Sequence, residues 1–187
     1  MRKAPKRPVA NTIPALPDLE VDALDTTERV VQYCIRHNLI DGVEVDIERL
    51  IELNPNLTLR RKPLADGIDA YIRETSPSRY EIGVNSNHSR TRQKFSMAHE
   101  FAHYQLHRDN LDGLELGERI LHRSDERNHL EYQANAFAAA LLMPEDIFRT
   151  EVRRTQGDIS ALAERFGVSQ LALRYRAKTL GLRGHGV

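Results

Sequence analysis

The sequence has a single cysteine, no tryptophan and no excess of charge of either sign. With Cys34 alone, neither an internal disulfide nor a cysteine-rich zinc knuckle can form, and a lone thiol fits a reducing cytoplasm. The 27 basic and 27 acidic side chains cancel, so the whole-chain charge indicates no class of partner. No apolar run approaches the roughly 18 residues of a membrane-spanning helix. We therefore expect a cytoplasmic protein without a membrane partner.

The first 22 residues lack the apolar segment that a secretory signal would place behind its basic residues. Four of the eight prolines fall within the first twenty residues, together with Arg2, Lys3, Lys6 and Arg7. This composition is typical of a disordered chain with extended, polyproline-like segments. We predict that residues 1–22 form a disordered, basic, Pro-rich tail.

Downstream of the tail, the hydrophobic pattern predicts helices, then short strands, then helices again. A helical pattern begins at Thr26, which can cap it, and a second short one covers 45–53. Amphipathic helices are also predicted over 92–107 and 125–143. The predicted strands between them are the β-rich runs 57–61, 68–73 and 80–84. We predict a mostly helical α+β domain with a small, largely antiparallel, three-stranded sheet.

The predicted helix 92–107 contains an H-E-x-x-H motif from His99 to His103. Positions i and i+4 of a helix lie on one face, so these two imidazoles can bind the same cation. Glu100 is displaced by about 100° around the axis and would lie beside the metal, where it can act as a general base toward water. Composition alone produces such a motif by chance in roughly 3% of comparable chains. The alternative interpretation is a solvated helix face with two unrelated histidines.

A catalytic zinc ion needs a third protein ligand and an open fourth position. The glycine and histidine that follow a metzincin motif are absent, because Leu106 and Asp109 occupy those positions. Glu131 lies at the start of the apolar face of the helix predicted over 125–143, where an unpaired carboxylate would be unfavourable. We predict Glu131 as the third ligand, ahead of Glu126 and His129 near the helix start.

Other polar residues on these two helices could support the ligands. Asn135, one turn after Glu131, is expected to hydrogen-bond the outer nitrogen of a ligand histidine. His107 continues the histidine face but lies about 6 Å further along the axis, so we predict a supporting or packing role rather than ligation. The transition-state oxyanion also needs a donor, for which Tyr104 and Tyr132 are candidates. His107 and nearby arginines are also chemically able, and sequence spacing does not choose among these candidates.

Two long segments around these residues resemble the ImmA/IrrE family of metallopeptidases. Arg92–His107 is similar to the active-site helix of that family, and Glu131–Pro144 is similar to its third-ligand helix, including the closing Leu-Leu-Met-Pro. Ile82–Asn85 resembles the strand that precedes the active-site helix, and the resemblance covers about residues 25–150. One departure is Phe101-Ala102, where the family commonly has Leu-Gly.

The resemblance implies a zincin-like domain with one Zn²⁺ per chain, and another divalent ion such as Mn²⁺ is compatible with the same ligands. It also implies an endopeptidase whose substrates are typically helix-turn-helix transcriptional repressors, often of mobile elements or stress regulons. Glu100 would then be the catalytic base, and His99, His103 and Glu131 would be the metal ligands.

The C-terminal segment from Asp158 to Arg176 has the pattern of a helical hairpin of the helix-turn-helix type, with a glycine turn and a serine cap. Seven basic and two acidic residues between 152 and 187 give a local charge of +5. Gln170, Arg174 and Lys178 share a helix face and could contact DNA or a protein partner. We favour packing or partner binding over DNA binding, because Arg176 stands where a reading helix usually buries an apolar residue.

The sequence thus predicts three parts: a tail over 1–22, a zinc metallopeptidase domain over 23–150, and helix-turn-helix-like helices over 151–187. The predicted function is hydrolysis of a peptide bond in a protein partner. The alternative is a non-catalytic, metal-containing regulatory protein that binds a repressor or DNA through its C-terminal helices. The sequence does not determine the oligomeric state.

Overall fold

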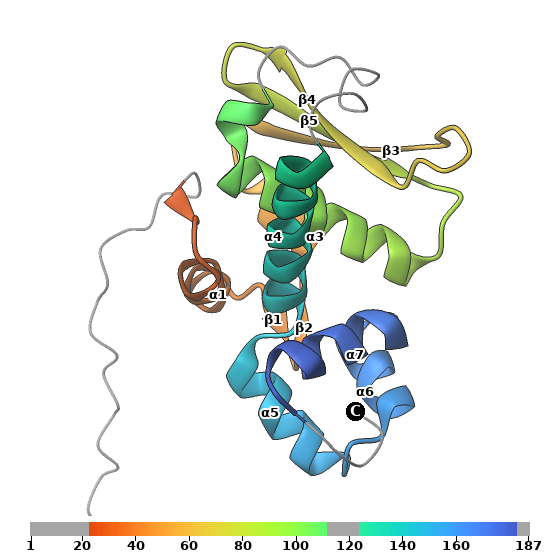
Figure 1. The fold of residues 1–187 in the computed structure, drawn as a ribbon. Helices are drawn as coiled ribbons and strands as arrows, with labels where there is room; N and C mark the ends of the chain where they lie inside the picture. Colours follow the sequence, from red (N-terminus) through yellow and green to blue (C-terminus); the bar gives the residue numbers. More distant parts are fainter. Residues whose placement is uncertain (1–22, 112–123, 183–187) are drawn as a thin grey trace, which may run out of the picture.

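The computed structural model describes residues 23–111 and 124–182. The tail predicted over residues 1–22 lies outside the described residues, as do residues 112–123 and 183–187. Helices surround one face of a small sheet, and the predicted α+β class is confirmed (Figure 1). No described helix is long and apolar enough to cross a membrane.

All of the helices except α5, which was not predicted, lie close to the predicted positions. The helices are α1 (Thr27–Arg36), α2 (Ile47–Glu52), α3 (Arg90–Leu106), α4 (Ser124–Leu142), α5 (Glu145–Arg154), α6 (Ile159–Phe166) and α7 (Gln170–Thr179). The Thr26 hydroxyl accepts a hydrogen bond from the Arg29 amide and caps α1 as expected. The helix predicted from residue 45 begins two residues later, because the Asp46 carboxylate caps α2 and Val45 belongs to a strand.

The strands are β1 (Ile40–Asp41), β2 (Glu44–Val45), β3 (Leu57–Lys62), β4 (Ala70–Ser76) and β5 (Arg79–Asn85). The antiparallel β1–β2 hairpin was not predicted, although Gly42 stands at the first position of its two-residue turn with a φ of +61°, where hairpin turns often have glycine. Strands of two residues are too short to produce a hydrophobic alternation, and this explains the omission.

The main sheet has the order β3-β5-β4 and is mixed, so the predicted, largely antiparallel sheet is wrong for one of its two strand pairs. β4 and β5 pair antiparallel across a tight turn, whereas β3 and β5 pair parallel. The reason lies in burial. Four consecutive residues of β5, Ile82–Asn85, are buried, while β3 and β4 carry exposed basic side chains. The most buried strand, β5, occupies the centre of the sheet between β3 and β4, and β3 is therefore its parallel neighbour.

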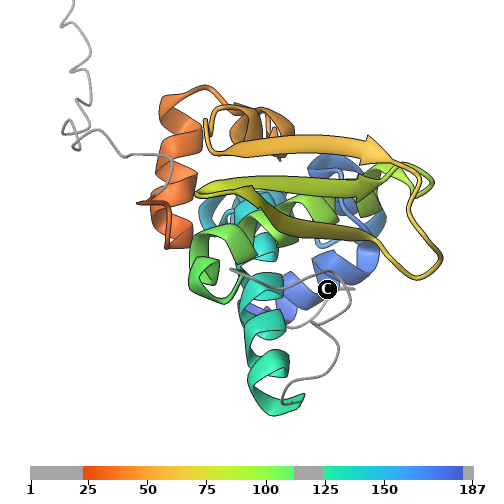
Figure 2. The same cartoon turned by 90° about the horizontal axis from the view of Figure 1, so that it is seen from above.

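The helices pack against one face of this sheet. α3 lies against β4 and β5, α2 lies against β3, and α4 crosses α3 on the side away from the sheet (Figures 1 and 2). Ile72, Ile82 and Val84 from the sheet join Met97 and Phe101 of α3 in the buried core. The sheet and this core therefore fix the position of α3, which carries the H-E-x-x-H motif.

The C-terminal helices share this core. Gly167 has a φ of +61° in the turn between α6 and α7, and the Ser169 hydroxyl accepts from the Ala172 amide and caps α7. The Lys94 ammonium of α3 donates to the Phe166 carbonyl at 2.9 Å, and the Arg176 guanidinium donates to the Met143 carbonyl at 3.0 Å. The boundary predicted at residue 150 falls inside α5.

Position 83 has no room for a side chain, because an aromatic ring lies directly over it. Gly83 lies opposite Tyr71 in the β4–β5 register, and a Cβ at this position would come within 2.2 Å of the Tyr71 ring. Gly83→Ala is expected to displace the ring and to lower the free energy of unfolding by about 1–3 kcal/mol, measured by urea denaturation.

A double-mutant cycle provides the control for this prediction. In a Tyr71→Ala background the ring is gone, so Gly83→Ala should have a much smaller effect there than in the wild type. An equal loss of stability in both backgrounds would show that the ring is not the cause.

Candidate metal centre

The crossing of α3 and α4 brings together the three predicted ligands. The Nε2 atoms of His99 and His103 lie 3.1 Å apart. Glu131 of α4 places one carboxylate oxygen 3.2 Å from His99 Nε2 and the other 3.5 Å from His103 Nε2. Within the described part of the chain these residues form a cluster whose ligand atoms all lie within 4.8 Å of one another.

The separations of these atoms fit one tetrahedral metal ion. Ligand atoms at the usual zinc distances of about 2.0–2.1 Å and at tetrahedral angles lie about 3.3 Å from one another. The three measured separations, 3.1, 3.2 and 3.5 Å, are close to that value. Two imidazoles and one carboxylate are also a donor set that zinc and similar divalent ions bind. The residues present therefore fit a divalent metal.

Asn135 orients the first histidine. Its side-chain oxygen lies 3.1 Å from His99 Nδ1, on the opposite side of the ring from Glu131. If Nδ1–H donates to this oxygen, the Nε2 atom keeps its lone pair for a cation. The contact predicted for Asn135 is thus present in the structure.

The second histidine is held through a chain of two further residues. His103 Nδ1 lies 3.0 Å from His107 Nδ1, and His107 Nε2 lies 3.0 Å from the Gln133 side-chain oxygen. Because an amide oxygen only accepts, His107 donates from Nε2 and accepts at Nδ1, so the proton between the two rings resides on His103. This arrangement leaves His103 Nε2 unprotonated and directed at the centre.

Gln133 was missed by the sequence reasoning. It is two residues after Glu131, so about 200° of helix rotation separates the two Cβ directions. Helical periodicity therefore gave no sign that its side chain would reach His107, which caps the C-terminal end of α3.

Electrostatics favour the cation-binding charge state at Glu131 and His103 but oppose it at His99. The close contacts with His103 and His99 hold the pKa of Glu131 well below its usual range. Burial is the strongest influence on the pKa of His103 and lowers it, although the hydrogen bond with Glu131 acts in the opposite direction. Burial also acts downward on His99, but the hydrogen bond with Glu131 and the charge of Glu100 outweigh it and raise its pKa.

Glu100 lies beside this cluster and is not one of its three members. It follows His99 on α3, is only 7% exposed, and its charge acts on the His99 ring. A carboxylate one residue from a ligand and largely shielded from water can exchange a proton with a water molecule at the centre.

The two tyrosine candidates lie in different surroundings. Tyr104 is fully buried, and its ring packs edge-on against Tyr80 of β5, so the structure does not present it to a substrate. Tyr132 follows Glu131 on α4 and is 59% exposed. Burial, followed by the charge interaction with Tyr132, raises the pKa of Tyr175 of α7.

The other predicted binding residues are not members of the cluster of His99, His103 and Glu131. Gln170, Arg174 and Lys178 are exposed on α7, and the Gln170 amide donates to the Ser160 hydroxyl at 3.2 Å. Side chains of residues 124–127 lie outside the described part of the structure, so the weaker candidate Glu126 is not placed.

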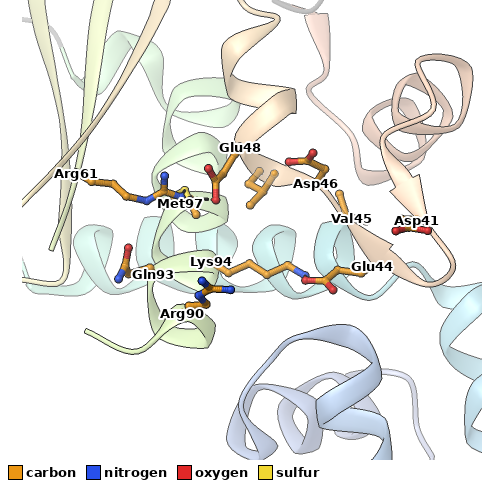
Figure 3. Close-up of a pocket in the computed structure, with 11 residues that line it drawn as sticks. Asp41, Glu44, Val45, Asp46, Glu48, Arg61, Arg90, Gln93, Lys94 and Met97 are labelled. Carbon is orange, nitrogen blue, oxygen red and sulfur yellow. Dashed lines mark hydrogen bonds and ion pairs between the residues drawn. The ribbon is translucent and has the colours of Figure 1, made fainter. Parts of the chain in front are cut away.

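A pocket of about 680 Å³ lies along α3 but does not include the histidines (Figure 3). Four of its charged groups form two ion pairs. The Lys94 ammonium donates to Glu44 at 2.7 Å, and the Arg61 guanidinium pairs with Glu48. These contacts join α3 and β3 to the β1–β2 hairpin and α2, so we assign this pocket a structural role.

Removal of the Gln133 acceptor is expected to weaken metal binding. Gln133→Leu leaves the His107 N–H without its partner and frees His103 to adopt the other tautomer, so zinc affinity should fall about 10–100-fold. Gln133→Glu keeps an acceptor and should bind zinc about as tightly as the wild type. Competition with a chromophoric chelator measures both affinities, and equal affinities for Gln133→Leu and the wild type would contradict the assigned role.

Comparison with known proteins points to one family. The sequence model of the M78 peptidase family, described as the IrrE N-terminal-like domain, matches residues 52–178, which include the H-E-x-x-H motif and Glu131. A search of curated proteins gave no match. Among solved structures, a Mycobacterium tuberculosis transcriptional regulator is similar, with a TM-score of 0.62 and 18% sequence identity. The match covers 81% of this chain and 46% of that chain, so this chain spans about half the length of that protein. At this identity the similarity shows the fold alone.

Proposed function

Because the chain belongs to the M78 peptidase family with its IrrE N-terminal-like domain, we propose that it is a zinc-dependent endopeptidase acting on a protein partner. Family membership indicates a metallopeptidase-like domain and a divalent metal. The observation that carries the finer proposal is the convergence of His99, His103 and Glu131 beside the largely buried Glu100. The helix of the motif lies beneath a small sheet, which supports a zincin-like arrangement.

Each residue has a distinct role in this proposal. His99, His103 and Glu131 would hold zinc, which when bound acts as a Lewis acid and lowers the pKa of water. Glu100 accepts the proton of the attacking water and then delivers it to the leaving amine. Asn135 and His107 keep the ligand imidazoles in the orientation and tautomer that direct Nε2 to the centre.

The edge of β4 offers a place for an extended substrate. β4 pairs with β5 on one side, and no strand of the described residues pairs with its other side. α3 packs against β4, so this edge lies close to the helix of the motif. A substrate segment could pair with this edge through main-chain hydrogen bonds, which accept most sequences.

A helix-turn-helix repressor is the partner that we propose, because the sequence resembles a family with such substrates. The test is incubation of the zinc-loaded protein with purified helix-turn-helix repressors, including any encoded beside it, followed by mass spectrometry of the products. A single new pair of termini that disappears on chelation is the expected result. Stable binding of a repressor without cleavage would favour the non-catalytic regulatory protein instead.

A further inference from the structure

The face of the main sheet turned away from the helices is strongly basic. Its outward charged side chains come from all three strands, and we call them the outer face: Arg60 and Lys62 of β3, Arg73 of β4, and Arg79 and Glu81 of β5. Four cations and one carboxylate give a net charge of +3, on a chain whose total formal charge is zero. The described helices lie on the other side of the sheet (Figure 2).

The cations of the outer face are accessible, whereas its carboxylate is largely covered. The Arg60 and Arg73 side chains are 66% and 47% exposed, and that of Glu81 is 14% exposed. Glu81 accepts a hydrogen bond from Arg73 at 2.8 Å and lies 3.9 Å from Arg60. Glu81 therefore holds the Arg73 guanidinium group while it presents little negative charge to a partner.

This composition fits a phosphate backbone better than an acidic protein. Protein interfaces need aromatic or aliphatic anchors at their centre. The one large ring on the outer face, Tyr71, is 5% exposed and lies beneath Lys62 and Arg73. Three of the four cations are arginines, whose planar groups bind phosphate oxygens with two parallel hydrogen bonds.

The covered ring also distinguishes between forms of nucleic acid. Proteins that hold single strands stack unpaired bases on exposed aromatic rings, and no exposed ring is present on the described outer face. A duplex needs no such rings, because a non-specific protein contacts only its phosphates. We propose that the outer face docks the protein on the phosphate backbone of double-stranded DNA without reading its sequence. This docking is independent of the metal centre.

The test is the salt dependence of binding to a fluorescent 20-base-pair DNA duplex, measured by anisotropy. Four phosphate contacts predict a slope of about −3.6 in log affinity against log salt concentration, which is a loss of about 150-fold between 50 and 200 mM salt. Arg60→Gln/Lys62→Gln removes two contacts from exposed positions on an edge strand. The affinity of this variant for the duplex at 50 mM salt should be lower than that of the wild type. Its affinity should fall by only about 12-fold between 50 and 200 mM salt.

Matched controls separate this site from other basic residues. Arg153→Gln/Arg154→Gln removes the same charge from exposed positions on α5 and should bind as the wild type does. Glu100→Gln should also bind DNA normally. Unfolding midpoints of all variants check that the fold is intact. Equal losses in the α5 and outer-face variants, or a loss confined to Arg174→Gln/Lys178→Gln on α7, would overturn the proposal. The proposal would also be overturned if single-stranded DNA, duplex RNA or polyglutamate bound as tightly as duplex DNA does.

Discussion

Replacement of Glu100 with glutamine is expected to lower peptide-bond hydrolysis by about 10²–10⁴-fold and to leave zinc binding unchanged. Glutamine keeps the size of the side chain but cannot accept the proton of the attacking water. Glu100 is not a member of the ligand cluster, so His99, His103 and Glu131 keep their places in the variant. The measurements are single-turnover cleavage of an identified substrate and zinc content per chain.

Glu164→Gln is the matched control, because it makes the same chemical change at an exposed position on α6. That variant should cleave at the wild-type rate. Full activity in Glu100→Gln would show that Glu100 is not the catalytic base. Loss of zinc together with activity would mean that Glu100 contributes to ligation.

Glu131→Ala is expected to abolish the stabilisation that zinc gives to the folded protein. A ligand that binds only the folded state at 100 times its dissociation constant adds about 2.7 kcal/mol to the free energy of unfolding. For a chain of this size, that corresponds to an increase of roughly 5–10 °C in Tm. Without the carboxylate, two imidazoles alone hold the ion weakly, and the increase should disappear.

Calorimetric scans of both proteins with zinc and with a chelator measure this effect. The control is His129→Ala, which removes an exposed histidine from the same helix and should keep the full increase in Tm. An equal increase in Glu131→Ala and the wild type would show that zinc binds elsewhere. The same comparison with Mn²⁺ would show whether the centre prefers one ion.

Some features of the candidate site follow from local sequence alone. His99 and His103 share a face because the helix repeats every 3.6 residues, and the same rule separates Glu100 from them. Glu131 could be selected because a carboxylate on an apolar helix face needs a partner. Caps such as Thr26 and Ser169 satisfy amides three residues away, so their signals also lie within one turn.

Other features depend on contacts between distant segments. The parallel pairing of β3 with β5 depends on which strand is buried most, and this depends on the helices beneath the sheet. Gln133 reaches His107 only because α4 crosses α3 at one particular position. Tyr104 has the right chemistry for an oxyanion donor, but it is buried against Tyr80 of β5.

Local sequence was sufficient to select the residues that we propose as ligands and base and to predict the helices that carry them, because helical periodicity and capping operate over a few residues. The order of the strands, the Gln133 contact and the outer face depend instead on long-range packing. Arg60 and Arg73 are thirteen positions apart in the sequence and lie on the two edge strands of the sheet. Sheet register places them on one face beside Glu81, and register is fixed by packing across the whole chain.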